Sequence, residues 1–531
     1  AKNGSATIVN ANDADGDLNV TTVGKVANDL TITNLKNGKA NAVRFDKNLQ
    51  AGGTIAVTNE EADIEVANGT TMEAQHISLT AKNNNVKFTG GTVTAKETVK
   101  AEAKNAGVTG GTISTKTVRA EAEKLAVSGG MINASAVEAT KALEITGGTI
   151  QTGSGAGQVS ADSISMSNGT MGGNDLLIKS NKDINQKGGQ ISAAKVTLDA
   201  GNTINQTAGS ILAKDTTVKA GKDINLESTT NKLQNVRVDA KNGSATVVNA
   251  NDADGDLNIT TVGKVANDLT ITNLKNGKAN AVRFDKNLQA GGTIAVTNEE
   301  ADIEVANGTT MEAQHISLTA KNNNVKFTGG TVTAKETVKA EAKNAGVTGG
   351  TISTKTVRAE AEKLAVSGGM INASAVEATK ALEITGGTIQ TGSGAGQVSA
   401  DSISMSNGTM GGNDLLIKSN KDINQKGGQI SAAKVTLDAG NTINQTAGSI
   451  LAKDTVAKAG ADVKLASRTN KLQNVRINAK NGSATVVSAN DAAGDLNVTT
   501  DGKVANNLTI TNLKNGKANA VRFDKNLQAG G

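Results

Sequence analysis

Short apolar segments recur along the chain at an almost constant spacing. Between residues 91 and 209, turns that end in glycine return every 18 to 21 residues. In the segment 99–103, Val-Lys-Ala-Glu-Ala, small apolar residues alternate with charged residues. This alternation has the period of a β-strand with one buried face. The pattern therefore predicts short strands separated by glycine turns.

The apolar positions of successive segments align in three columns. The first column follows the turns and contains Val93, Ile113, Ile132, Ile150, Met171, Ile191 and Ile211. The second contains Val99, Val118, Val137, Val159, Ile178, Val196 and Val218. The third contains Val108, Val127, Ile145, Ile164, Ile184, Ile204 and Ile224. Three columns predict an all-β parallel solenoid with three short strands per coil and about 20 residues per coil.

A helix is the competing interpretation of segments such as residues 95–102, which are good helix formers by propensity. The equivalent positions of other coils hold residues 158–161, Gln-Val-Ser-Ala, and 195–198, Lys-Val-Thr-Leu. Those residues favour strands. Because positions that repeat must share one structure, the pattern favours strands throughout.

A longer repeat contains the short one. Residues 1–239 recur as 240–478, and residues 479–531 begin a third copy. The first two copies differ at eleven positions, nine of them between Thr217 and Asp239. We expect one continuous solenoid of two full units and a partial unit, with about twelve coils and about 58 Å of length per full unit. The chain starts without an initiator Met or signal peptide and stops inside a unit, so we expect it to be a piece of a longer array.

The amino-acid composition fits a thin core with few aromatic side chains. The chain has 60 glycines and five phenylalanines but no proline, cysteine, tryptophan or tyrosine. Without proline, every backbone N–H can join a strand ladder. Without cysteine, disulfides and thiolate metal sites are excluded. We expect Phe45 and Phe88 to fill the core where coils change width.

The distribution of charged residues argues against binding to nucleic acid or to membranes. The 55 basic and 50 acidic residues are interspersed, and no basic run is long enough for a nucleic-acid or lipid surface. No segment approaches the roughly 18 apolar residues that span a bilayer. We therefore expect no nucleic-acid partner and no membrane insertion.

The segments 182–191, Lys-Asp-Ile-Asn-Gln-Lys-Gly-Gly-Gln-Ile, and 199–206, Asp-Ala-Gly-Asn-Thr-Ile-Asn-Gln, carry a family resemblance. They resemble the coil repeats of filamentous haemagglutinin-type adhesins, which are secreted by two-partner or autotransporter routes in Gram-negative bacteria. The resemblance implies a right-handed parallel β-helix, export through an outer-membrane pore, and a place in a cell-surface fibre. The chain departs from the family in that its 239-residue units are almost identical, whereas family shafts usually diverge from coil to coil.

One acidic cluster has the composition of a calcium loop. It contains Asp13, Asp15 and Asp17, with the copies Asp252, Asp254 and Asp256. The glycine and glutamate of a helix-flanked calcium loop are not in their places, and the third copy has Ala493 where the first has Asp15. A calcium site and a solvated turn are both open interpretations. We expect no other cofactor.

The remaining polar candidates each have a structural alternative. Asn185, Asn205 and Asn225 recur at one-coil spacing and could form an amide ladder or simply occupy turns. His76 and His315 have no second ligand nearby, so we expect outward strand residues. Several Asn-x-Ser/Thr triplets, including those at Asn3, Asn19, Asn68 and Asn133, are glycosylation acceptors or chance matches.

These features together predict a non-catalytic structural protein. We expect the shaft of an extracellular bacterial fibre, whose partners are further copies of the repeat and, through regions outside this sequence, another cell surface. A laterally packed filament or sheath is the first alternative. A polysaccharide-active enzyme is the second, although the chain lacks Trp and Tyr for sugar stacking and would repeat any site in each unit.

Overall fold

The computed structural model describes residues 1–250, 252–275, 277–489, 494–514, 518–523 and 525–531. They form two compact units, Ala1–Gly255 and Asp256–Gly531. From here on, the first and second unit mean these two structural units, which do not coincide with the sequence copies 1–239 and 240–478. Every regular element in these ranges is a strand, and no helix occurs there. The strands stack in parallel as a β-solenoid with about 25 coils of roughly 20 residues. The predicted fold class is confirmed, and residues 95–102 lie in a strand.

The first unit holds strands β1 to β24 and the second holds β25 to β50. The strands of the first unit are β1 (Ala6–Asn10), β2 (Leu18–Asn19), β3 (Leu30–Asn34), β4 (Val43–Phe45), β5 (Leu49–Gln50), β6 (Thr54–Asn59), β7 (Ile64–Val66), β8 (Thr71–Phe88), β9 (Thr92–Val108), β10 (Thr112–Glu121), β11 (Lys124–Val127), β12 (Met131–Ala139), β13 (Ala142–Ile145), β14 (Thr149–Gln151), β15 (Ala156–Ala161), β16 (Ser163–Met166), β17 (Thr170–Gly172), β18 (Asp175–Ser180), β19 (Ile184–Ser192), β20 (Lys195–Ala200), β21 (Ile204–Ala220), β22 (Ile224–Leu226), β23 (Lys232–Ala240) and β24 (Ala245–Asn249).

The strands of the second unit are β25 (Leu257–Thr261), β26 (Leu269–Asn273), β27 (Val282–Phe284), β28 (Leu288–Gln289), β29 (Thr293–Asn298), β30 (Ile303–Val305), β31 (Thr310–Phe327), β32 (Thr331–Val347), β33 (Thr351–Glu360), β34 (Lys363–Val366), β35 (Met370–Ala378), β36 (Ala381–Ile384), β37 (Thr388–Gln390), β38 (Ala395–Ala400), β39 (Ser402–Met405), β40 (Thr409–Gly411), β41 (Asp414–Ser419), β42 (Ile423–Ser431), β43 (Lys434–Ala439), β44 (Ile443–Ala459), β45 (Val463–Leu465), β46 (Lys471–Ala479), β47 (Ala484–Ser488), β48 (Leu496–Thr500), β49 (Leu508–Asn512) and β50 (Val521–Arg522).

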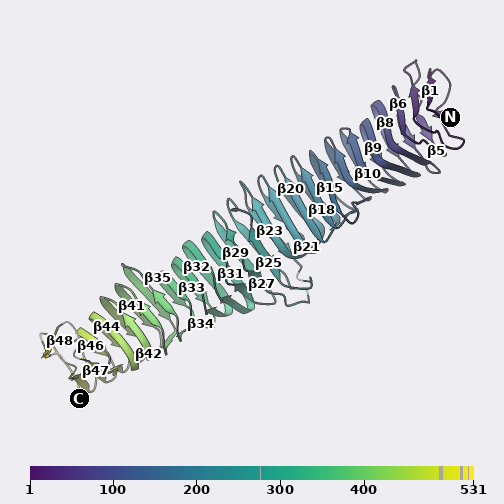
Figure 1. The fold of residues 1–531 in the computed structure, drawn as a ribbon. Helices are drawn as coiled ribbons and strands as arrows, with labels where there is room; N and C mark the ends of the chain where they lie inside the picture. Colours follow the sequence, from purple (N-terminus) through teal and green to yellow (C-terminus); the bar gives the residue numbers. More distant parts are fainter. Residues whose placement is uncertain (251, 276, 490–493, 515–517, 524) are drawn as a thin grey trace. The chain divides into compact units, whose positions relative to one another are not determined.

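Each coil has three strand segments. In the first unit, β14, β15 and β16 make one coil, and they pair in parallel with β17, β18 and β19 of the next coil. Other coils run through their corners as one long bent strand. For example, β9 pairs with β10 over one part of its length and with β11 over another. Within each unit, the strands of successive coils lie side by side (Figure 1).

Register pairing builds apolar columns inside the coils. Val93 pairs with Ile113, which pairs with Ile132, and each is at most 1% exposed. The same column continues through Ile150, Met171, Ile191 and Ile211. Another column contains the successive partners Ile184, Ile204 and Ile224, which are also buried. Removal of this apolar area from water is the main contribution to stability.

Two of the predicted columns are wrong in register. Ile178 pairs with Leu198 rather than with Val196, and Ile145 pairs with Met166 rather than with Ile164. In both cases the predicted and the observed partner stand two residues apart on one strand. Such residues point to the same face, so the apolar pattern does not distinguish them.

Coil size changes along each unit. The first strands are separated by longer coils, since Ala6 pairs with Leu30 and Leu30 with Ile55. Later partners are closer in sequence, as with Val118 and Val137. The Phe45 side chain lies in the wider part and is fully buried. Phe88 lies two coils further along the same column and is 3% exposed.

Turn glycines stack on one another at one corner. Gly111 has a φ of +72°, a conformation that side chains with a Cβ rarely adopt. A Cβ on Gly111 would lie 2.5 Å from the carbonyl carbon and oxygen of Gly90 in the preceding coil. Glycine is therefore required at Gly111 both for its backbone conformation and for the close approach of the two coils.

Candidate functional site

Three amide side chains replace apolar residues inside the first unit. The column of Val127, Ile145 and Met166 continues directly into Gln186 and Gln206. Strand alternation explains this placement, because Ile184 points inward, Asn185 outward and Gln186 inward. The exposed fractions of Gln186 and Gln206 are 3% and 1%. A buried amide is costly unless its donors and acceptors are paired.

The buried amides pair with one another. Gln206 Nε2 donates to Gln186 Oε1 at 3.1 Å and to Asn231 Oδ1 at 2.8 Å. Asn231 Nδ2 donates back to Gln206 Oε1 at 2.7 Å, and Asn231 Oδ1 also accepts from the backbone N–H of Ile211. We call Gln186, Gln206 and Asn231 the amide ladder. It joins three successive coils across the interior.

The second unit repeats the amide ladder with Gln425, Gln445 and Asn470. Gln445 Nε2 lies 3.1 Å from Gln425 Oε1 and 2.8 Å from Asn470 Oδ1. Asn470 Nδ2 donates to Gln445 Oε1 at 2.7 Å. Amides do not titrate, so this arrangement orders the core and supplies no acid, base or nucleophile.

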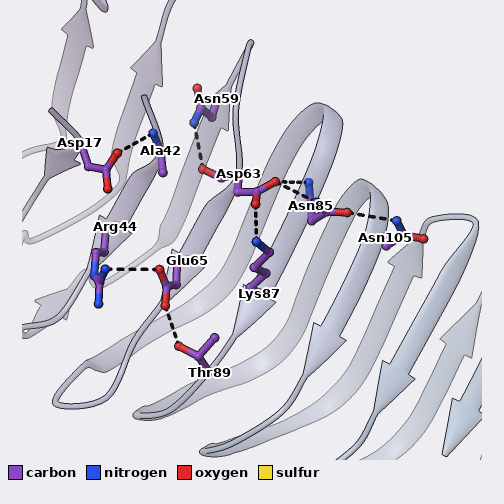
Figure 2. A network of polar contacts seen from close by, with 10 residues as sticks. All are labelled: Asp17, Ala42, Arg44, Asn59, Asp63, Glu65, Asn85, Lys87, Thr89 and Asn105. Carbon is purple, nitrogen blue, oxygen red and sulfur yellow. Dashed lines mark hydrogen bonds and ion pairs between the residues drawn. The ribbon is translucent and has the colours of Figure 1, made fainter. Parts of the chain in front are cut away.

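A second buried ladder lies in the wider coils. Asn10 Nδ2 donates to Asn34 Oδ1 at 2.6 Å, and Asn34 Nδ2 donates to Asn59 Oδ1 at 3.2 Å. Asn34 and Asn59 are fully buried. Asn59 also donates to the backbone oxygen of Asp63 (Figure 2). The alternation of Leu30, Ile32 and Asn34 along one strand is the sequence signal for this ladder.

The asparagines predicted as a column are register partners, but they lie on the outer surface. Asn185 pairs with Asn205, and Asn205 pairs with Asn225. Their side chains are half-buried, and no hydrogen bond in the described structure joins these side chains to one another. In the second unit the same outer positions are Asn424, Asn444 and Lys464. The hydrogen-bonded amides stand one residue further along, on the inner face.

An ionised network covers one corner of the wider coils (Figure 2). Asp63 Oδ1 accepts from the backbone N–H and the side-chain amide of Asn85, at 2.8 and 3.0 Å. Asp63 Oδ2 lies 2.5 Å from Lys87 Nζ. Asn105 in the next coil donates to Asn85 Oδ1 at 3.0 Å. The network thus links three coils through side chains.

The pKa of Asp63 lies below the usual value for an aspartate. Partial burial raises this pKa, but the hydrogen bonds from Lys87 and from Asn85 together lower it by more. The equivalent Asp302 of the second unit has a lowered pKa for the same reasons. The carboxylates therefore stay ionised at neutral pH and act as fixed hydrogen-bond acceptors.

A second polar contact in the same view involves the outer face of β7. Glu65 accepts from Thr89 Oγ1 at 2.9 Å and lies 3.6 Å from Arg44 on the opposite side. These three residues come from three successive coils (Figure 2). Each side chain is substantially exposed, so the contacts order the surface more than they stabilise it.

Outward charges on the narrower coils also pair along the stack. Lys100 Nζ lies 2.8 Å from Glu121 of the next coil and 3.1 Å from Glu102 of its own strand. Arg119 also contacts Glu121, at 3.0 Å. The hydrogen bond with Glu121, followed by that with Glu102, raises the pKa of Lys100. These pairs neutralise neighbouring charges on the outer face.

A shallow polar groove follows one corner over four coils. It is lined by residues 80–83, 102–104, 121–123 and 140–141. The second unit has the equivalent groove at residues 319–322, 341–343, 360–362 and 379–380. Lysines and glutamates alternate along it, and Glu121 is already paired with Lys100. The lining thus has neither one sign of charge nor an isolated carboxylate pair.

The aspartates of the first acidic cluster make separate contacts. Asp15 pairs with Lys39, and the Asp17 carboxylate accepts from the backbone N–H of Ala42 at 3.0 Å (Figure 2). Asp13 is exposed. Each carboxylate is thus accounted for by a contact of its own or by solvent.

The copies of this cluster behave similarly. Asp252 lies 2.7 Å from Lys232, the backbone oxygen of Asp254 accepts from Gln234, and Asp256 accepts from the backbone N–H of Ala281. Ala493, at the third copy's variant position, lies outside the described residues. Across the described ranges, no three His, Cys, Asp or Glu side chains gather where they could hold a metal ion.

The remaining candidates lie on the surface. His76 pairs in register with Thr54 and Thr98 and points outward. His315 is likewise exposed. Of the glycosylation triplets, Asn3, Asn19 and Asn68 are exposed and Asn133 is half-buried.

The fold and these sites define a class: a parallel β-solenoid of tandem copies, with apolar columns interrupted by buried amide ladders. No protein-family model, curated protein or solved structure matches the chain. A search of the described residues for a helix long and apolar enough to cross a membrane found none.

Proposed function

We propose that this chain is the shaft of an extracellular bacterial surface fibre, with a mechanical role and no catalysis. The observation that carries the proposal is the unbroken pairing of coil on coil within each unit. For example, β9 pairs with β8 on one side and with β10 and β11 on the other. Each coil thereby covers the open backbone edge and the apolar end of its neighbour.

Such a stack provides length by repetition. In the described structure, the strands of each coil pair with those of the coils next to it, so adding coils adds the same set of backbone hydrogen bonds. Stretching along the axis loads many backbone hydrogen bonds together, because three strand segments of each coil pair with the next coil. A shaft needs this combination of length and stiffness.

The differences between the first two copies favour a lengthening role. Three of them fall on buried positions and exchange one apolar residue for another: Val218 for Ala457, Ile224 for Val463, and Val238 for Ile477. Near-identical copies would duplicate any catalytic site without improving it. They would, however, add length directly.

The surface location is supported by the family resemblance of residues 182–191. The adhesins that carry such coil repeats are exported and form cell-surface fibres. We extend this to the present chain, with further repeat copies as its axial partners and with adhesion or cell–cell connection as the purpose of the shaft. The chain's balanced outer charges, such as Lys100 with Glu121, suit a fibre exposed to water.

A laterally packed filament is the second candidate, and one surface favours it. The strand segments that directly follow the glycine turns, residues 92–94, 112–114, 131–133, 149–151, 170–172, 190–192 and 210–212, contain no charged residue. Their outward residues are Thr92, Thr94, Thr112, Ser114, Met131, Asn133, Thr149, Gln151, Thr170, Gln190, Ser192, Ser210 and Leu212. Met131 is 41% exposed. A neutral face of this kind could contact the same face of a second chain.

Deletion of one copy tests the shaft. Removing residues 240–478 joins Asp239 to Ala479, the equivalent of the Ala240 that follows Asp239 in the intact chain. We expect electron microscopy of the purified chain to show a thin particle that is shorter by about 55 Å, from a strand spacing of about 4.8 Å. A compact particle of either chain, or an unchanged length, would refute the proposal.

Two measurements on producing cells address location and multiplicity. Antibodies against the chain should decorate fibres on intact cells along their length; labelling only after lysis would contradict a surface fibre. Mass per unit length of the native fibres should equal one 239-residue copy per about 55 Å. A multiple of that value would favour the laterally packed filament.

A further inference from the structure

The sequence repeat and the coil repeat do not coincide. In the second unit, Leu257 and Leu496 are equivalent residues of successive copies, and so are Leu269 and Leu508. If a copy held a whole number of coils, each residue would stand in the same column as its equivalent. Both columns can be followed through the second unit by register partners alone.

The column that begins at Leu257 does not lead to Leu496. Instead it reaches Ala484 after eleven coils, and Ala484 pairs with Leu508. Its members are Leu257, Val282, Ile303, Val325, Ala345, Leu364, Leu382, Ile403, Ile423, Ile443, Val463, Ala484 and Leu508. Leu508 therefore stands in the column of Leu257 and not in that of its own equivalent.

The column that begins at Leu269 makes the opposite exchange. It passes through β46 and ends on β48, the strand of Leu496, where Ile477 pairs with Thr500. Its members are Leu269, Ile294, Ile316, Val338, Val357, Val376, Val398, Ile417, Leu437, Ala457, Ile477 and Thr500. The two strands have thus exchanged columns at the start of the third copy.

The first unit contains the same step. Leu18 leads through eleven coils to Ile224, whose partner is Ala245. Ala245 is the equivalent of Ala6, but Ala6 begins a different column, that of Leu30 and Ile55. The exchange therefore occurs at both copy junctions.

The strands at the junction are well packed. Ala484 and Val486 are 1% and 0% exposed in one column, and Val498 is 0% exposed in another. On the third side of the coil, the N–H of Ala489 donates to the backbone oxygen of Asn470 at 2.7 Å. The junction thus buries its core without a whole-coil match.

We infer that one 239-residue copy spans more than eleven and fewer than twelve coils, so that a repeated surface feature returns to the same side of the shaft only after two copies. One exchange moves a strand to the other column, and a second exchange restores it. Two copies then make about 23 coils, and the true axial period is about 110 Å instead of about 55 Å.

The register implies a pattern of partner binding along the fibre. This implication rests on the proposed shaft function, whereas the register itself does not. A partner that binds once per copy would be held on alternating sides of the fibre. The fibre could then bridge surfaces on its two sides, and a neighbouring chain packed against it would meet the same face only at every second copy.

Engineered disulfides test the register, since the chain has no cysteine of its own. Lys464→Cys with Thr485→Cys, and Arg476→Cys with Thr499→Cys, join register partners across the junction. Neighbouring strands at about 4.8 Å are within the Cα range of a disulfide. The control, Asn478→Cys with Thr509→Cys, would be adjacent only if Leu508 stood in the column of its equivalent Leu269, directly after Ile477.

We expect the first two pairs to lose nearly all free thiol on mild oxidation and the control pair to keep it, as measured by thiol titration and peptide mass spectrometry. Oxidation of the control in preference to the other pairs would overturn the inference. A shaft refuted by the deletion of residues 240–478 would leave this disulfide pattern unchanged, so the two failures are distinguishable.

Gold labelling tests whether equivalent residues of successive copies lie on different sides of the shaft. Thr270 and Thr509 are exposed equivalents in the second and third copies. In a chain that carries Thr270→Cys and Thr509→Cys, we expect electron microscopy to find the two maleimide-gold particles on different sides of the particle axis. Two particles in line on one side would overturn the inference.

Discussion

Gln206 occupies an interior position that neighbouring coils fill with apolar side chains, and it hydrogen-bonds to amides of the coils on either side. An apolar column tolerates a slip by two residues because any apolar side chain fits beside any other. An amide column tolerates it poorly, because a slip would leave donors and acceptors unpaired in a dry interior. At the residue scale, we therefore assign the ladders a role in fixing register.

Replacing the central amide by a carboxyl group tests this role. In a chain with Gln206→Glu and Gln445→Glu, the carboxylate oxygen would face the acceptor oxygens of Gln186 and Asn231. Burial and these acceptors should raise the pKa of the new glutamate above its unfolded value of about 4.3. Folding should therefore be little affected below about pH 4 and should lose about 2–4 kcal/mol per site as pH rises through the folded pKa. Thermal unfolding followed by circular dichroism at both pH values measures this.

The matched control is Asn205→Asp with Asn444→Asp, one residue away on the outer face. It introduces the same charge into solvent, and we expect less than about 0.5 kcal/mol of change at either pH. Equal losses in both variants would mean that the inner amides have no special role.

Asp63 gives the opposite pH dependence. Its folded pKa lies below the unfolded value, so its contribution is present above the unfolded pKa and is lost as pH falls through the folded pKa. Asp63→Asn with Asp302→Asn should cost about 1 kcal/mol per site at pH 7 and nothing in strong acid. The unfolding temperature across this pH range is the measurement.

The exposed pair of Asp175 with Lys195, 2.9 Å apart, supplies a control for the Asp63 variant. Asp175→Asn with Asp414→Asn removes an ion pair without removing a backbone cap, and exposed pairs contribute little. If this change costs as much as the Asp63 change, the hydrogen bonds from Asn85 are not the cause.

The sequence predicted the solenoid because alternation and the glycine turns repeat many times, so a local ambiguity at one coil is resolved by its neighbours. It placed Ile184, Ile204 and Ile224 correctly in one column. It assigned Val196 and Ile164 to columns in which the residues two positions further along, Leu198 and Met166, actually stand. The same alternation placed Gln186 inside, two residues after Ile184. The polarity of the repeated asparagines indicated Asn185 as the ladder residue instead, although Asn185 points outward. The hydrophobic pattern does not determine the register, because turn geometry and buried hydrogen bonds set it.

At the element scale, the corner that carries Gly91, Gly111, Gly189 and Gly209 sets how closely successive coils approach. Strand residues tolerate exchange, as Val218 and Ala457 show. The stacked corner tolerates much less, because a Cβ there would meet the backbone of the coil below. The glycine corner therefore determines where each strand begins.

Gly111→Ala with Gly350→Ala should destabilise the fold by at least about 1–2 kcal/mol per site, from the left-handed conformation alone. The approach of the new Cβ to Gly90 and to Gly329 adds to this cost. Gly107→Ala with Gly346→Ala is the control, because no atom lies within 4 Å of either Cβ and neither φ is positive. The control should be neutral or stabilised by up to about 0.5 kcal/mol. Chemical denaturation measures the free energy of unfolding of the two double variants. Equal values would contradict a special role for the glycine corner in the packing of successive coils.

At the scale of the whole molecule, the unit of growth is the coil and not the 239-residue copy. Copies meet out of phase, yet Ala484 and Val498 are buried at the junction. The stack therefore accepts any continuation that presents apolar residues in register. Stability in such a chain is approximately a sum over coils and their nearest neighbours.

Removal of one coil should therefore be tolerated where removal of half a coil is not. Deleting residues 195–214 joins Ala194 to Asp215, the register partner of Lys195, and brings Leu226 beside Gln186 in the same inner column, because Gln206 is the register partner of both. We expect an unchanged strand content per residue and a melting temperature within a few degrees. Deleting residues 205–214 instead sets inward residues such as Val218 against a corner, and we expect aggregation or rapid proteolysis. If both deletions fold equally well, coil register does not govern the assembly of this chain.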